Sequence, residues 1–60
     1  MSGAAASLRP LTLQLVRQPG PLLAQIEAAL AAHGEPLRWA ITAVEPGAAT
    51  VLTLEAVVLA

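Results

Sequence analysis

The chain has 60 residues and a formal net charge of −1; it is 57% hydrophobic, 12% charged and 2% aromatic, and it contains no cysteine. This length allows one domain, and the apolar content excludes a disordered charged tail. Disulfides, thiol redox chemistry and cysteine metal sites are excluded as well. A chain this small buries only about 60% of its unfolded surface. Because small domains usually add disulfides, a metal or a partner, we expect a partner.

The N-terminal residues 1–7 are small and polar, and we expect a flexible tail there, followed by a single domain over residues 8–60. The tail has no basic side chain, and Arg9 and Pro10 interrupt the apolar residues after it, so a secretory signal is not expected. The longest apolar stretch, residues 48–60, is shorter than the roughly 20 residues of a membrane span. We expect a soluble, cytoplasmic protein with no membrane contact.

The first predicted elements are a strand over residues 8–17 and a helix over residues 21–33. Leucines alternate with Thr12, Gln14 and Val16, which is the period of a half-buried strand. Pro21 suits the first helical position, with Gly20 before it as N-cap. Gly34 follows as the expected stop. One helix face is apolar, and its members are Leu22, Leu23, Ile26, Ala29 and Leu30.

Two further strands are predicted over residues 37–45 and 50–59, joined by a turn at Pro46-Gly47. Proline presets φ at the second turn position, and we expect Gly47 to supply a positive φ at the third, as in a type II turn. We favour a four-residue loop over a two-residue loop, because this turn type splays a tight hairpin. Arg38 should then lie opposite or diagonal to Glu55.

These elements predict an α+β fold: a single β-α-β-β domain with a three-stranded antiparallel sheet and one helix on one face. The last strand is apolar on both faces, which favours the central position and the sheet order 1-3-2. The layout is similar to half of a ferredoxin-like unit. The expected helix-facing set is Leu11, Leu13, Leu15, Leu37, Trp39, Ile41, Leu52, Leu54, Ala56 and Val58.

The second face of the predicted sheet mixes apolar and polar side chains, as protein–protein interfaces do. Its apolar members, which we take as candidate interface residues, are Val16, Ala40, Val44, Val51, Val57 and Leu59. The alanine-rich back of the helix is a second candidate surface, although alanine is also simply the best helix former.

Catalytic and cofactor chemistry finds little support in the sequence. The four glutamates lie on different elements, and no Ser/His/Asp set can be assembled, because the chain has no aspartate and its serines lie in the tail. His33 could be a general base or a metal ligand with Glu35, but a cation at the helix C-terminus is the simpler interpretation. We therefore expect no enzyme activity, no catalytic residues, no cofactor and no metal.

Trp39, the only aromatic residue, is in phase with Leu37 and Ile41, so we assign it to the core, with an interface anchor as an alternative. Three arginines and no lysine argue against nucleic-acid binding.

The size and element order resemble those of the small tautomerases that assemble as hexamers. Those enzymes use an exposed N-terminal proline, whereas position 2 here is serine and the first proline is Pro10. The resemblance therefore implies no activity. We expect a small protein–protein interaction or scaffold module that self-associates through its sheet, with a dimer favoured and a different protein partner possible. The alternative is a small-molecule-sensing module with a ligand site at a subunit boundary.

Overall fold

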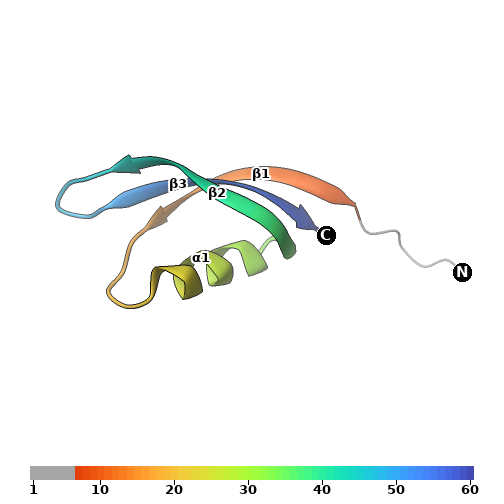
Figure 1. Cartoon of the computed structure of the whole chain (residues 1–60), viewed down its shortest axis with the longest axis horizontal. Coiled ribbons are helices and arrows are strands. Elements are labelled where there is room, and N and C mark those ends of the chain that lie inside the picture. The colour runs from red at the N-terminus through yellow and green to blue at the C-terminus, as the bar shows by residue number, and fades with distance from the viewer. Residues whose placement is uncertain (1–6) are drawn as a thin grey trace, which may run out of the picture.

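The computed structural model describes residues 7–60 and shows the predicted β-α-β-β order (Figure 1). The elements are β1 (Leu8–Val16), α1 (Leu22–Ala31), β2 (Glu35–Glu45) and β3 (Val51–Leu59). The sheet is antiparallel with the order β1-β3-β2, and α1 lies along one face of it. The α+β fold and the strand order predicted from the sequence are thereby confirmed. The predicted tail lies outside the described residues except for Ser7.

The core lies between α1 and the central strand. Ile26 and Leu30 project from the helix onto β3, where every second side chain is buried. Leucines of β1 and Trp39 of β2 pack around this centre and are half-buried. The buried hydrophobic residues are Ile26, Leu30, Leu52, Leu54, Ala56 and Val58. Trp39 thus packs against the core, as predicted. Leu23, a predicted member of the apolar helix face, is instead 55% exposed.

The helix is shorter than predicted at both ends. Its N-cap is Pro21 rather than Gly20, and no side chain caps it. The loop before the helix is instead tied to it by Gln25: its Oε1 accepts a hydrogen bond from the Gln18 N–H, and its Nε2 donates to the Gln18 carbonyl, each at 2.8 Å. Gly34 follows the helix with φ +148°. β2 begins directly after it, at Glu35, two residues earlier than predicted.

Two β-bulges in β2 change the predicted pairing with β3. Arg38 lies across from Val57, and is therefore diagonal to Glu55 as predicted, but register shifts occur between Pro36 and Arg38 and between Ile41 and Ala43. Each bulge adds a residue to one strand and so reverses the alternation of faces beyond it. Gly47 has no positive φ, so the predicted type II turn is wrong, and the loop occupies residues 46–50.

Candidate functional site

The face of the sheet turned away from α1 is uncovered by any described residue, and we call it the open face (Figure 1). Residues directly across from each other in antiparallel strands share a face. Because Leu54 and Ala56 face the helix, their neighbours along β3 belong to the open face. The members of the open face are Leu8, Pro10, Thr12, Gln14 and Val16 of β1; Glu35, Arg38, Ala40, Ala43 and Glu45 of β2; and Val51, Thr53, Glu55, Val57 and Leu59 of β3.

Five of the six predicted interface residues lie on the open face, and Val44 does not. The second bulge places Val44 directly across from Leu52, a buried residue on the helix side. The side chain is nevertheless 56% exposed, because it lies where the hairpin extends beyond the helix (Figure 1). The prediction that Val44 shares a sheet face with the other five residues is therefore wrong, because the bulge shifts the alternation along β2.

The larger apolar side chains of the open face gather at its two ends, where β2 also places Glu45 and Glu35. One end holds Val16 and Val51, which lie directly across from each other. The other end holds the larger group, which we call the Val57 cluster: Leu8, Pro10, Val57 and Leu59. Leu8 is 66% exposed, whereas Val57 and Leu59 are half-buried. Leu8 and Pro10 were not among the predicted interface residues, although both are in phase with Thr12 and the same alternation, extended to the start of β1, includes them.

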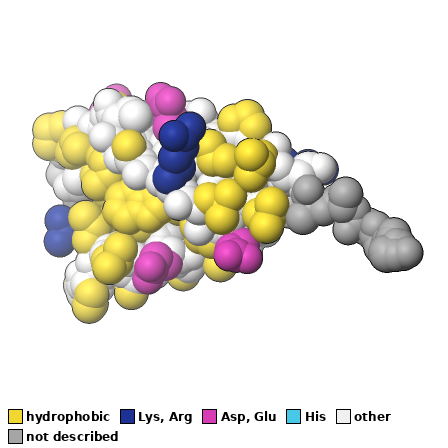
Figure 2. Space-filling model, turned by 45° about the vertical axis from the view of Figure 1, so that its right-hand side comes forward, with side chains coloured by type: hydrophobic (Ala, Val, Ile, Leu, Met, Phe, Trp, Pro, Cys, Tyr) yellow, Lys and Arg dark blue, Asp and Glu magenta, His cyan; other side chains and the backbone are white. Residues whose placement is uncertain are grey.

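A polar band separates the two apolar ends. Thr12 of β1 and Ala40 of β2 flank Glu55, and Gln14 and Ala43 flank Thr53. Apolar groups with a few polar ones between them are typical of a surface that binds protein. Figure 2 shows one side of the molecule, where exposed hydrophobic side chains are interrupted by a few charged ones.

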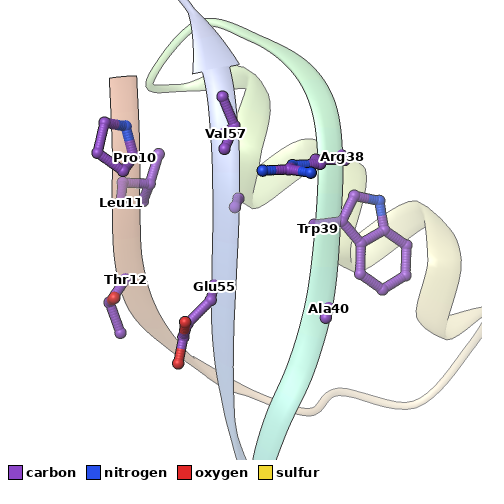
Figure 3. A pocket seen from close by; sticks show the side chains of 9 residues that line it. Pro10, Leu11, Thr12, Arg38, Trp39, Ala40, Glu55 and Val57 are labelled. Carbon is purple, nitrogen blue, oxygen red and sulfur yellow. The ribbon is translucent and has the colours of Figure 1, made fainter. Parts of the chain in front are cut away.

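The boundary between the Val57 cluster and the polar band is hollowed. A shallow depression of about 440 Å³ spans all three strands there. Figure 3 shows Pro10 and Thr12 on one side, Arg38 and Ala40 on the other, and Glu55 and Val57 between them. The depression thus offers one cationic and one anionic group beside an apolar floor, so it can accept an amphipathic side chain or a small polar molecule.

The other candidates for chemistry are not brought together. His33 is exposed beyond the helix end, where its backbone N–H donates to the Leu30 carbonyl at 2.9 Å. All four glutamates are exposed, on α1 and on both strands of the hairpin. Residues 7–60 contain no group of three His, Cys, Asp or Glu side chains that could hold a metal ion. No helix in the same range is long and apolar enough to cross a membrane.

Fold and surface together define a small α+β domain whose sheet has one covered and one open face. The chain belongs to the family described as Domain of unknown function (DUF8621), whose model matches residues 7–60. No curated protein shows significant similarity to the chain, and no solved structure does either.

Proposed function

We propose that this domain is a non-enzymatic protein–protein interaction module, acting in the cytoplasm, that self-associates by packing the open faces of two copies together. The observation that supports this function is the Val57 cluster on a sheet face without a covering layer. Stable domains bury each apolar face against another layer. Here one ten-residue helix covers one face, so a second copy supplies the missing layer.

Sedimentation of a Val57→Glu variant tests the proposal. Val57 lies in the middle of the cluster and directly across from Arg38. A glutamate at this position therefore finds an opposite charge within its own chain, and the isolated subunit tolerates it. In the stacked assembly the same carboxylate would be taken out of water, at a cost of several kcal/mol. We expect the wild-type chain to self-associate and the variant to lose this contact.

Ala28→Glu is the matched control, because it adds the same charge on the exposed back of α1. Circular dichroism and Trp39 fluorescence report whether each variant is folded at the concentration used. The proposal fails if the wild-type chain is a stable monomer over a wide concentration range. It also fails if Val57→Glu and Ala28→Glu have the same oligomeric state.

The depression beside Arg38 supports a second function, a small-molecule-sensing module. Stacking of two open faces would enclose this depression at the subunit boundary, and its volume of about 440 Å³ lies within the range of about 300–1,000 Å³ for ligand sites. A thermal-shift screen with small metabolites tests this function. A true ligand raises the unfolding temperature of the wild-type chain but not that of Arg38→Ala, and the absence of any shift would refute sensing.

A further inference from the structure

The outer edge of β1 has backbone groups that no described strand uses. Ser7 and Ala60 exchange two backbone hydrogen bonds, at 2.9 and 3.0 Å, and the Arg17 N–H donates to the Thr50 carbonyl at 2.9 Å. The β1–β3 register between these points is unbroken. Hydrogen-bonded and non-hydrogen-bonded pairs alternate along antiparallel strands. The odd-numbered residues of β1 therefore bond to β3, and the backbone groups of even-numbered residues point outward.

Proline restricts where another strand can pair with this edge. Pro10 occupies an outward position and has no N–H to donate, as is usual for proline in an edge strand. Beyond it, Thr12, Gln14 and Val16 present a regular outward ladder in an uncharged segment, residues 11–16. One contact partly covers this ladder: Gln18 Nε2 donates to the Val16 carbonyl at 3.4 Å.

The opposite edge of the sheet, formed by β2, is less suitable for pairing. Pro36 stands near its start, and the two register shifts interrupt the ladder on either side of Trp39. Bulges and prolines are common ways in which proteins prevent strands from pairing at an edge. The regular outward ladder of β1 is thus the better site for strand addition.

We propose that β1 pairs antiparallel with β1 of a second copy, centred on Gln14, to form a continuous six-stranded sheet. This inference rests on the proposed self-association and names an additional contact for it. Gln14 would pair with Gln14 of the second copy, and Thr12 with Val16. Shifting the centre to Leu13 would instead bring Arg9 opposite Arg17, and like charges directly opposite each other are unfavourable. Charge therefore disfavours the register centred on Leu13 relative to the one centred on Gln14.

Apolar burial and area support a second copy as the occupant. The helix-side leucines Leu11, Leu13 and Leu15 are only half-buried, and in this register Leu13 lies across from Leu15 of the other copy. The open face of one chain, three strands about 30 Å long and about 4.8 Å apart, projects roughly 430 Å². Stable interfaces bury about 800 Å² per partner. Joining two sheets at β1 doubles the open face available for stacking.

Amide hydrogen exchange on the wild-type chain tests the edge contact directly. The outward N–H groups of Thr12, Gln14 and Val16 exchange quickly in an unpaired edge. In the paired assembly we expect them to slow by at least about tenfold as concentration rises, while the outward amides of Trp39 and Val44 on β2 stay fast. Equally fast exchange of both edges at all concentrations would overturn the proposal.

A proline variant separates the edge contact from the stacking of open faces. Gln14→Pro removes the central donor, and Pro10 shows that β1 accepts proline at an outward position; Val44→Pro is the control on β2. We expect a wild-type tetramer at high concentration, dimers for Gln14→Pro and for Val57→Glu, and a monomer for the double variant.

The masses of the variants in solution also distinguish the β1 edge contact from the stacking of open faces. If Gln14→Pro has the wild-type mass, the edge contact is refuted, whether or not the open faces stack. If Gln14→Pro is a monomer while Val57→Glu keeps the wild-type mass, the edge contact is supported and the stacking of open faces is refuted. Should Gln14→Pro fail to fold, Thr12→Pro removes the neighbouring donor and the same masses are compared.

Discussion

Replacing Gly34 by alanine should destabilise the domain more than the same change at any other described glycine. Gly34 has φ +148°, where side chains other than glycine cost about 1–3 kcal/mol. A Cβ at this position would also lie 2.6 Å from the carbonyl oxygen of Leu59 and 3.1 Å from the Cβ of Ala60. Leu59 pairs with both β1 and β2, so its carbonyl oxygen cannot move without disturbing the sheet. Overpacking of this kind adds about 1–3 kcal/mol.

Two other glycines provide matched controls for Gly34→Ala. Gly20 has φ +110° but open space around its Cα, so Gly20→Ala should cost only the conformational part, about 1–3 kcal/mol. Gly47 has no positive φ, and a Cβ there would make an ordinary 3.5 Å contact. Gly47→Ala should stabilise the chain by about 0.4–1 kcal/mol, because it restricts the unfolded state.

Urea denaturation followed by Trp39 fluorescence, at one fixed protein concentration, would measure the free energy of unfolding for all three variants. The expected order of stability is Gly47→Ala, wild type, Gly20→Ala and Gly34→Ala. If Gly34→Ala were no less stable than Gly20→Ala, the close approach of Leu59 would not constrain the helix–strand junction, and this reasoning would be refuted.

Three further predictions concern the core, the loop and assembly. Leu54→Ala, at a fully buried position, should cost about 2–5 kcal/mol and unfold a dilute sample, whereas Ile41→Ala, at a 39% exposed position, should cost clearly less; chemical denaturation compares them. Gln25→Ala should cost roughly 1–3 kcal/mol, because it removes two hydrogen bonds to the backbone of Gln18. Gln18→Ala keeps these backbone groups, so its thermal unfolding should not show the same loss of stability. The wild-type unfolding temperature should rise with protein concentration in calorimetry, because association stabilises the folded state; a constant value would contradict self-association.

The strand order could be predicted because one strand differs from the others in composition. Apolar and polar residues alternate only weakly along β3, and both of its faces carry large apolar side chains. A strand of that kind must be covered by neighbours on both edges, which places it in the middle. The helix followed from the spacing of Ile26 and Leu30 and from the proline and glycine at its ends. These signals are local, and the tertiary structure agrees with them.

The details of β2 could not be predicted, because they depend on its partner strand. Alternation from Leu37 to Val44 is continuous in the sequence, and nothing local marks the residues where the bulges fall. The structure leaves Leu37 50% exposed and moves Val44 to the helix side. Near the second bulge, the Thr42 hydroxyl reaches the Thr53 carbonyl at 3.5 Å. Pairing to β3, rather than propensity, therefore determines which side chains the open face displays.

The proposed self-association rests on the mismatch between a short helix, which covers one sheet face, and a central strand that is apolar on both faces. α1 covers Leu54 and Ala56 on one face of β3, but Val57 and Leu59 project from the other face, where no described element lies. Antiparallel sheets with one solvated face commonly have polar residues at such positions. The polar band around Glu55 also distinguishes the open face from a hydrophobic core, which would be apolar throughout. Apolar ends separated by a polar centre fit a contact that two folded copies make and break.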